Sequence, residues 1–300
     1  MRIITPALAA CALIAAFIDP ATAASTTNRA HTVASVAADA KPWQCGLPLR
    51  KPDGSAWTCR FVDHFSGTRL NTASWTVQKS SNSAAAPALA CWEDDPENVR
   101  VSGGSLHLTV RKKSAPFLCQ SPWGDFTTQY TGGSISTWDK LEMTYGRYEI
   151  RARFPTATVA GIHSAIWLYP REMTYGPWPR SGEIDIAEYF TKYPDRAIPN
   201  IHYNDAGLDP STNNQCYIRN PRMFHTYTVE WTPGLITIDY DRKRCLTHRI
   251  KAASLTGSAP FDKPFFLVLT QTLGIGQNPF NASTTPLPQT MEVDRVRVWK

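Results

Sequence analysis

Long apolar runs, helical periodicity and blocks of like charge are scarce in this chain of 300 residues. The only long apolar stretch lies near the N-terminus, and it is shorter than the roughly 20 apolar residues of a transmembrane helix. The net charge is +6 and the longest basic run is Arg111-Lys112-Lys113, which argues against nucleic-acid binding. No long segment repeats its apolar residues with a helical period, and we find no internal repeat. These absences disfavour membrane-spanning, nucleic-acid-binding and helical proteins.

Several catalytic and metal-binding motifs are also absent. The chain has no Gly-x-Ser-x-Gly elbow of a serine hydrolase. It has no cysteine and histidine spacing typical of a zinc site, and no Asp-x-Asp-x-Asp-Gly calcium loop. A different arrangement of side chains must therefore supply any chemistry.

The N-terminus has the pattern of a secretory signal peptide. Arg2 precedes a largely apolar stretch from Ile3 to Phe17, and the small residues Ala21-Thr22-Ala23 follow. We expect residues 1–23 to be a signal peptide, residues 24–41 a flexible leader, and residues 42–300 one catalytic β-sandwich domain. The mature protein is expected to be a secreted monomer with no membrane partner.

The cysteine count fits an exported protein. Six cysteines remain after Cys11 is removed with the signal, and an even number in such a protein indicates three disulfides. Six cysteines allow 15 pairings. Pairing of near neighbours closes hairpin-sized loops, so we expect Cys45–Cys59, Cys91–Cys119 and Cys216–Cys245.

Strand patterns dominate the rest of the chain. Short segments with alternating or continuous apolar residues recur, and turn residues separate them, with Gly103-Gly104 and Gly132-Gly133 as the sharpest turn signals. Many short strands indicate an all-β sandwich or jelly roll. The expected strands are 105–110, 146–154, 225–232, 235–240, 265–269 and 292–299.

Three carboxylates occur within six residues, Glu183-Ile-Asp-Ile-Ala-Glu188. On a helix Glu183 and Asp185 would point roughly 200° apart, whereas on a strand they share a face. Glu188 is out of phase by one residue, so a β-bulge near Ile186 and Ala187 would bring all three acids to one face. The glutamate Cα atoms would then lie about 13 Å apart, and the carboxyl groups can approach to about 5 Å, the separation in retaining glycosidases.

This crowding suits two carboxylates with different tasks, because like charges raise one another's pKa. We expect Glu183 to be ionised and act as nucleophile, and Glu188 to hold its proton near neutral pH and act as acid, then base. Asp185 would orient the nucleophile and share its titration. A solvated edge strand is disfavoured by the apolar Ile184 and Tyr189. A calcium site is disfavoured because a strand offers few carbonyls to one ion.

Ten tryptophans and two histidines supply candidate sugar contacts, since indole rings stack on the apolar faces of sugars. Trp167 and Trp178 lie near the acids in sequence, and Trp92 and Trp138 are weaker candidates. His202 would lie on a neighbouring strand beside Glu188, and either sugar binding or a structural role fits it. For His163, too, either sugar binding or a structural role fits the sequence. Three further tryptophans are expected in the core: Trp75, Trp231 and Trp299.

These segments resemble glycoside hydrolase family 16 over nearly all of residues 42–300. The central match is Glu183 to Glu188, with the longer, bulged spacing of the laminarinase-like branch. The supporting segments follow in the family's order: Phe65-Ser-Gly-Thr, Gly132-Gly-Ser-Ile-Ser-Thr, Thr144-Tyr-Gly-Arg-Tyr-Glu-Ile-Arg-Ala-Arg-Phe, Ala165-Ile-Trp-Leu, Trp178-Pro-Arg-Ser-Gly, His225-Thr-Tyr-Thr-Val-Glu-Trp-Thr, Pro264-Phe-Phe-Leu and Val293-Asp-Arg-Val-Arg-Val.

The resemblance implies a concanavalin-like jelly-roll β-sandwich of two antiparallel sheets, the concave one forming a cleft for a long glycan. It implies an endo-acting retaining β-glycanase, with β-1,3-glucan as the expected substrate, and the same roles for Glu183, Asp185 and Glu188. The alternatives are hydrolysis or transglycosylation of another, galactan-type β-glycan, and a non-catalytic glycan-binding protein, which would have no reason to keep both glutamates. The candidate substrate-binding residues are Trp138, Arg147, His163, Trp167, Trp178, His202 and Gln271.

The chain departs from the family's pattern at three places. His163 stands where many β-1,3-glucanase members have a tryptophan. The segment from Thr270 to Gly274 replaces an asparagine-rich strand, so Gln271 would supply the cleft amide. Members often hold calcium on the convex face; Asp294 matches one ligand, but His64 stands where the family has a glutamate. We therefore expect no cofactor, with Asp294 the sole candidate for a structural calcium.

Overall fold

The computed structural model describes residues 42–83, 88–203, 212–252 and 254–300. The expected signal peptide and leader, residues 1–41, lie outside the described residues. Among the described residues, no helix has the length and apolar character needed to cross a membrane. The regular elements are η1 Pro42–Cys45, β1 Cys59–Asp63, β2 Thr76–Val77, η2 Ser80–Asn82, β3 Cys91–Trp92, β4 Val99–Ser102, β5 Ser105–Cys119, β6 Phe126–Ser136, β7 Glu142–Met143, β8 Gly146–Arg153, β9 Ile162–Pro170, β10 Glu183–Phe190, β11 Ile198–His202, β12 His225–Thr232, β13 Leu235–Tyr240, β14 Lys243–Arg249, β15 Phe265–Leu273 and β16 Gln289–Trp299.

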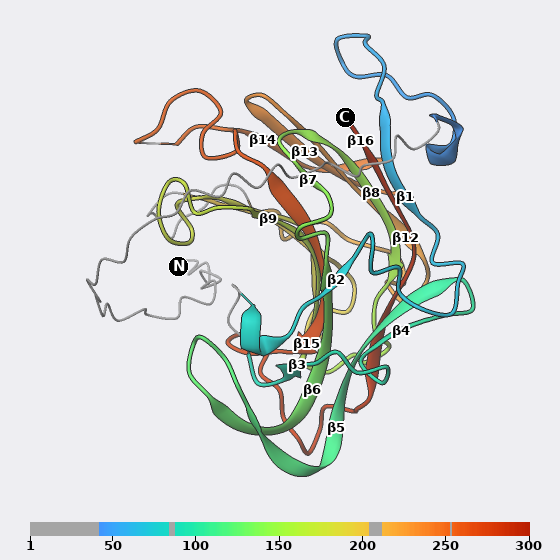
Figure 1. Cartoon of the computed structure of the whole chain (residues 1–300), viewed down its shortest axis with the longest axis vertical. Helices are drawn as coiled ribbons and strands as arrows, with labels where there is room; N and C mark the ends of the chain where they lie inside the picture. The colour runs from blue at the N-terminus through green and yellow to red at the C-terminus, as the bar shows by residue number, and fades with distance from the viewer. Residues whose placement is uncertain (1–41, 84–87, 204–211, 253) are drawn as a thin grey trace, which may run out of the picture.

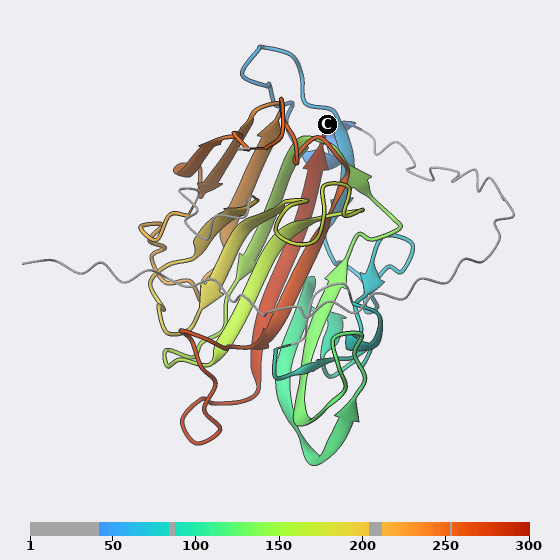
Figure 2. The ribbon, with the colours of Figure 1, turned by 90° about the vertical axis from the view of Figure 1, so that its left-hand side faces the viewer.

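The strands form two curved layers. The front sheet runs β11-β10-β9-β15-β6 and the back sheet runs β5-β16-β8-β12-β13-β14. The β5–β6 hairpin connects them, because the first part of β5 pairs with β16 and its later part pairs with β6. Figure 1 shows the layers edge-on, curving in the same sense, and Figure 2 shows the hollow face of the front sheet. The expected all-β jelly-roll sandwich is confirmed.

Alternation in the sequence builds the back sheet. Along β8 every second side chain is buried: Tyr148 and Ile150 enter the core between the layers, whereas Arg147 and Glu149 lie on the outer face. Apolar side chains from both sheets fill one large core cluster. The tryptophans assigned to packing are buried as expected, with exposures of 2% or less: Trp75, Trp231 and Trp299.

Strand β15 occupies the middle of the front sheet and is buried along its whole length. Leu267 and Leu269 belong to the core between the sheets. Val268, which alternates with them, belongs to a separate apolar cluster on the opposite face. Both faces of this strand are therefore covered, and the strand extends to Leu273, beyond the end at Leu269 that the sequence indicated.

The two glycine pairs have different roles. Gly103 and Gly104, with φ of +61° and +76°, form the tight turn between β4 and β5, as predicted. The turn predicted at Gly132 and Gly133 is wrong, because both lie inside β6. A Cβ on Gly132 would lie 2.6 Å from the carbonyl oxygen of Gln271, so close approach of β15 requires glycine there.

Three disulfides confirm the expected pairing. Cys45–Cys59, Cys91–Cys119 and Cys216–Cys245 have Cα separations of 5.8, 5.7 and 5.5 Å. The second of these ties β3 to the end of β5 and so fixes the β5–β6 hairpin against the front sheet.

Candidate active site

Strand β10 carries the three acids, and it contains the predicted bulge. Against β9, its register shifts between Asp185, which faces Trp167, and Ala187, which faces Ile166. Ile186 is the extra residue, and its carbonyl accepts a hydrogen bond of 2.9 Å from the buried hydroxyl of Tyr240. The bulge therefore leaves no unsatisfied carbonyl at this position.

The bulge brings the acids to one face of the front sheet. Asp185 and Glu188 lie opposite Trp167 and Ala165, two residues apart on β9, so their side chains share that face. Glu183 is two residues before Asp185 on the regular part of β10 and has the same orientation. Asp185 is 3% exposed, and the two glutamates are partly exposed. The side chains between them pack in the core: Ile184, Ile186 and Ala187.

Glu183 and Asp185 have separate partners. The indole N–H of Trp178 donates a hydrogen bond of 3.0 Å to Oε2 of Glu183. Nε2 of His202 lies 3.1 Å from Oδ2 of Asp185, and the Trp178 and His202 rings are 5.5 Å apart. His202 on β11 lies opposite Glu183 on β10. The predicted position of His202 beside Glu188 is therefore wrong.

His163 takes the place beside Glu188. Its Nε2 lies 3.2 Å from Oε1 of Glu188, and its ring stacks on Phe190 with centroids 4.5 Å apart. The two glutamates thus have different surroundings: an indole donor beside one and an imidazole beside the other. Such a difference suits two carboxyl groups with different roles.

Burial raises the pKa of Glu183 well above its ordinary value of 4.5, and the nearby Asp185 and Glu188 carboxylates raise it further. His202 and the Trp178 N–H oppose the shift. The sequence interpretation assigned the raised pKa to Glu188 and expected Glu183 to be readily ionised. The structure instead places a raised pKa on Glu183.

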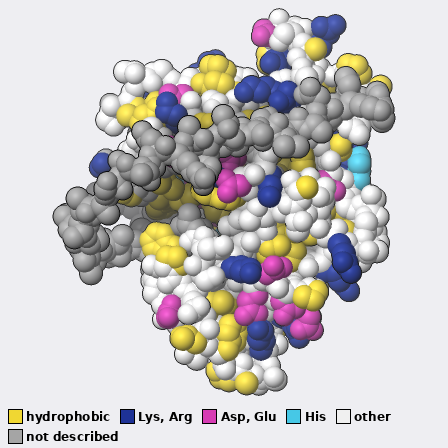
Figure 3. Space-filling model, viewed as in Figure 1, with side chains coloured by type: hydrophobic (Ala, Val, Ile, Leu, Met, Phe, Trp, Pro, Cys, Tyr) yellow, Lys and Arg dark blue, Asp and Glu magenta, His cyan; other side chains and the backbone are white. Residues whose placement is uncertain are grey.

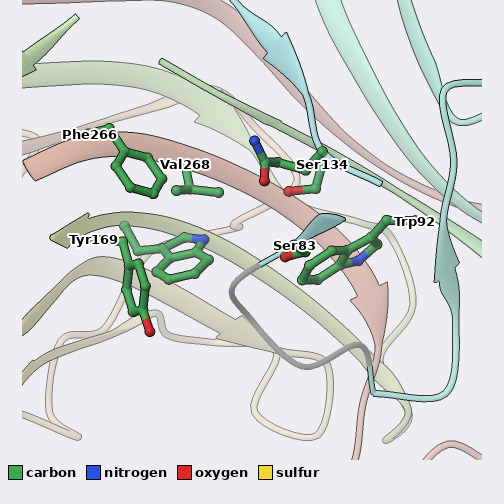
Figure 4. Close-up of a pocket in the computed structure, with 8 residues that line it drawn as sticks. Ser83, Trp92, Ser134, Tyr169, Phe266 and Val268 are labelled. Atoms are coloured by element: carbon green, nitrogen blue, oxygen red, sulfur yellow. The ribbon is translucent and has the colours of Figure 1, made fainter. Parts of the chain in front are cut away.

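A small aromatic-lined pocket lies on the same face of the front sheet as the acids, beside Trp167, which is opposite Asp185. Trp167, Tyr169, Phe266 and Val268 line a pocket on this face, and Trp92 closes its far end (Figure 4). Trp138 packs edge-on against Phe266, with centroids 5.0 Å apart. A groove of this kind presents apolar ring faces and a few polar groups, which is the chemistry of a sugar site.

The chain matches the model of "Glycosyl hydrolases family 16" over residues 88–275. It is 32% identical to the glucan endo-1,3-beta-glucosidase A1 of Niallia circulans over 79% of this chain and 37% of that protein. The chain belongs to glycoside hydrolase family 16.

Two further proteins are also similar to this chain. The chain is 33% identical to a keratan-sulfate endo-1,4-beta-galactosidase of Sphingobacterium multivorum, over 57% of this chain and 40% of that protein. The crystal structure of the laminarinase from Rhodothermus marinus superposes with a TM-score of 0.68 at 29% identity, covering 85% of this chain and 98% of that one. The chain thus spans less than half the length of these two curated relatives.

Two candidate substrate-binding residues do not lie on the exposed face that carries the acids. Arg147 is on the outer face of the back sheet, where it contacts Glu230 and Glu149. Gln271 is fully buried; it accepts a 2.5 Å hydrogen bond from Ser164 and donates to a backbone carbonyl. Neither can contact a glycan in the cleft, so both interpretations are corrected.

Three cleft residues were missed. Thr270 accepts a 3.1 Å hydrogen bond from the Trp167 indole and thereby positions that ring. Phe266 lines the floor, and the Glu183 carboxylate adds to the burial that raises the pKa of Tyr169, so Tyr169 is within electrostatic reach of the acids. Side chains alternate along a strand, so the sequence could have shown that residues 266, 268 and 270 share one face.

The residues suggested for calcium do not fit that ion. Asp294 is paired with Arg151, so a guanidinium already supplies the positive charge at that point. His64, in the position of the second ligand, is exposed and offers no carboxylate. The ligand atoms of Glu183, Asp185 and His202 lie within 4.8 Å of one another, but these groups already have the partners described above. We assign no metal to either place.

Proposed function

We propose that this chain is a secreted, endo-acting, retaining β-glycanase that hydrolyses β-1,3-glucan. The observation that supports this most strongly is the β10 bulge, which presents Glu183 and Glu188 on one face with different partners. The acids lie on the face of the curved front sheet that is turned away from the core (Figure 1), and this position suits attack within a long chain. Three disulfides suit an extracellular protein.

The proposed reaction has two displacements. In the first, the Glu183 carboxylate attacks the anomeric carbon while the Glu188 carboxylic acid protonates the departing glycosidic oxygen. In the second, Glu188 takes a proton from water, which attacks the same carbon and releases Glu183. Both steps invert, so the product keeps the β configuration.

Asp185 and His202 would prepare the nucleophile. Asp185 is almost completely buried and lies 3.1 Å from the His202 imidazole, so its carboxyl group is held in place beside Glu183. Its negative charge raises the energy of an ionised Glu183. Formation of the glycosyl ester removes that charge, which favours attack.

Two experiments test the function. Purified laminarin, mixed-linkage glucan, agarose and keratan sulfate are each incubated with the protein, and the products are identified by size; fastest release of oligosaccharides from laminarin supports the proposal. Azide added to Glu183→Ala should restore activity and give a glycosyl azide of inverted anomer. Recovery of only retained product would remove Glu183 from the nucleophile role.

A galactan-type substrate is the second candidate, because the galactosidase of Sphingobacterium multivorum is among the similar proteins. The same polysaccharide panel separates the two. A non-catalytic glycan-binding role predicts binding to one polymer with no products from any, and with no effect of Glu188→Gln.

A further inference from the structure

Trp92 is held firmly at the far end of the cleft. It lies on β3, parallel to β6 and opposite Gly132. Its backbone N–H donates a 2.8 Å hydrogen bond to Ser80, and the preceding Cys91 is bonded to Cys119 on the β5–β6 hairpin. A Cβ on residue 132 would lie 3.2 Å from the indole ring, so the missing side chain at Gly132 makes room for it.

This well-fixed ring has an unused polar atom. Trp92 is 5% exposed, and among the described residues its indole N–H has no hydrogen-bond acceptor. Indole N–H groups normally find a partner when they are buried, because an unpaired donor costs free energy. The N–H is covered in this structure, so a ligand hydroxyl accepts that hydrogen bond only when the neighbouring side chains move aside.

Trp92 also borders two hollows. On one side is the cleft pocket that it shares with Trp167 (Figure 4). On the other side is a groove of about 330 Å³ between residues 79–81 and 91–94 and the β5–β6 hairpin. This volume lies in the range of small-ligand sites. The side chains that line the groove include Lys79, Glu93, Asp94, Phe117 and Leu118.

The acids and Trp92 are connected by an unbroken row of strands. Asp185 on β10 is opposite Trp167 on β9, and β15, β6 and β3 follow in order. Four strand spacings of about 4.8 Å, with an offset of four residues along the strands from Ser136 to Gly132, place Trp92 roughly 23 Å from Asp185. A pyranose unit of an extended β-glycan is about as long as one strand spacing, so about four to five sugar units bridge this interval.

We propose that Trp92 and the groove beside the β5–β6 hairpin form a distal subsite that binds uncharged sugar units of the same glycan that is cleaved at the acids. This inference rests on the proposed function. In this distal subsite, the Trp92 N–H donates a hydrogen bond to a sugar hydroxyl, and the ring of Phe117 packs against the apolar face of a sugar.

The charges of the groove favour a neutral glycan. Lys79 lies 3.9 Å from Asp94, and Lys113 lies 2.5 Å from Glu93 and over the ring of Phe117. Each lysine is thus matched by a carboxylate, and the described residues that line the groove carry no excess of positive charge that would bind a sulfated chain. Figure 3 shows hydrophobic, acidic and basic side chains mixed over the lower part of the molecule, where the hairpin lies. Paired charges can still hydrogen-bond to hydroxyl groups.

The test compares substrates of two lengths. We measure kcat/KM for laminaritriose, which is too short to reach Trp92, and for laminariheptaose. In Trp92→Phe, which keeps a ring over Gly132 but has no N–H, loss of one hydrogen bond should lower the heptaose value about three- to tenfold and leave the triose value unchanged. Phe117→Ala should act in the same direction. Tyr217→Phe is the matched control, because it removes one polar atom from an exposed aromatic residue that lines neither hollow.

The outcomes separate the two proposals. If the wild type hydrolyses laminaritriose, and Trp92→Phe and Phe117→Ala leave the ratio of the laminariheptaose kcat/KM to the laminaritriose kcat/KM unchanged, the subsite is overturned. The proposed function then stays intact. Absence of hydrolysis in the wild type overturns the function. In that case affinity electrophoresis in gels with laminarin or soluble β-galactan still decides the subsite: weaker retardation of the two variants supports it, and equal retardation contradicts it. Melting temperatures confirm that each variant is folded.

Discussion

Nε2 of His163 lies 3.2 Å from Oε1 of Glu188, and the imidazole stacks on Phe190 with an interplanar angle of 7°. The stack fixes the imidazole, and the imidazole in turn fixes the carboxyl group that we propose as acid and base. A side chain that the sequence left open thus becomes the main positioning contact of Glu188.

Replacing His163 with Phe should test that contact. The phenyl ring can keep the stack on Phe190 but cannot bond to Glu188. Loss of a close polar contact worth about 1.4 kcal/mol in the transition state corresponds to a roughly tenfold fall in kcat, and we expect little change in KM. His225→Phe is the matched control, because His225 contacts Asp241 away from the acids. Equal kcat in the wild type and His163→Phe would show that the contact has no catalytic role.

Trp178→Phe should move the acidic limb of the pH profile. The indole N–H favours the ionised form of Glu183, so its loss raises a pKa that burial and Asp185 have already raised. Glu183 must be ionised to attack, and activity should therefore disappear at a higher pH than in the wild type. The measurement is kcat/KM against pH, which reports the free enzyme. A shift to lower pH would contradict this account.

Glu183→Gln should stabilise the protein at neutral pH. Because the folded-state pKa lies above 4.5, the folded protein binds this proton more tightly than the unfolded chain. The stability contributed by Glu183 is complete below pH 4.5 and is lost as the pH rises through the folded pKa. Each kcal/mol relieved by glutamine raises Tm by about 2–4 °C. The gain should appear at pH 8 and vanish near pH 4, roughly where both states are protonated.

Asp195→Asn is a control of opposite sign for that experiment. Hydrogen bonding to Arg196 lowers the pKa of Asp195, so its contribution is present at neutral pH and is lost in acid. This variant should therefore lower Tm at pH 8 and have less effect at pH 3. If Glu183→Gln instead lowered Tm at pH 8, an ionised Glu183 would be a stabilising group and its pKa would not be raised.

Removing the Cys91–Cys119 disulfide should weaken the fold around Trp92. The bond joins residues 28 apart, and constraint of a loop of this length contributes about 3–4 kcal/mol. We expect the double alanine variant to lose about this much in denaturant unfolding. It should also lose more activity on laminariheptaose than on laminaritriose. A loss of stability below about 1 kcal/mol would contradict the anchoring role.

The acid site was predictable because it depends on how side chains alternate along a single strand. Strict alternation along β10 fixes which residues share a face, and one extra residue between Asp185 and Glu188 is visible in the spacing. The disulfides were predictable for a similar reason, since each closes a short loop. The Trp167 and Trp178 positions followed from their closeness to the acids.

Other features depend on which strands are neighbours. Arg147 alternates correctly on β8, but nothing local shows that β8 belongs to the back sheet. Gln271 lies on a strand buried on both faces, so polarity gave no guide to the side that faces the cleft. Gly132 resembles a turn residue, and only the approach of β15 and Trp92 explains it. The sequence analysis placed His202 beside Glu188, where the structure has His163, because the sequence does not show which strands are neighbours.

The most direct test of the account is the identity of the residue that carries the glycosyl group. The protein is treated with an activated fluorosugar derivative of laminaribiose, which slows the second displacement, and the labelled peptide is sequenced by mass spectrometry. We predict that the sugar is attached to Glu183, and that Glu183→Gln remains unlabelled. Attachment to Glu188 or Asp185, or an inverted product with no labelled peptide, would contradict the proposed mechanism.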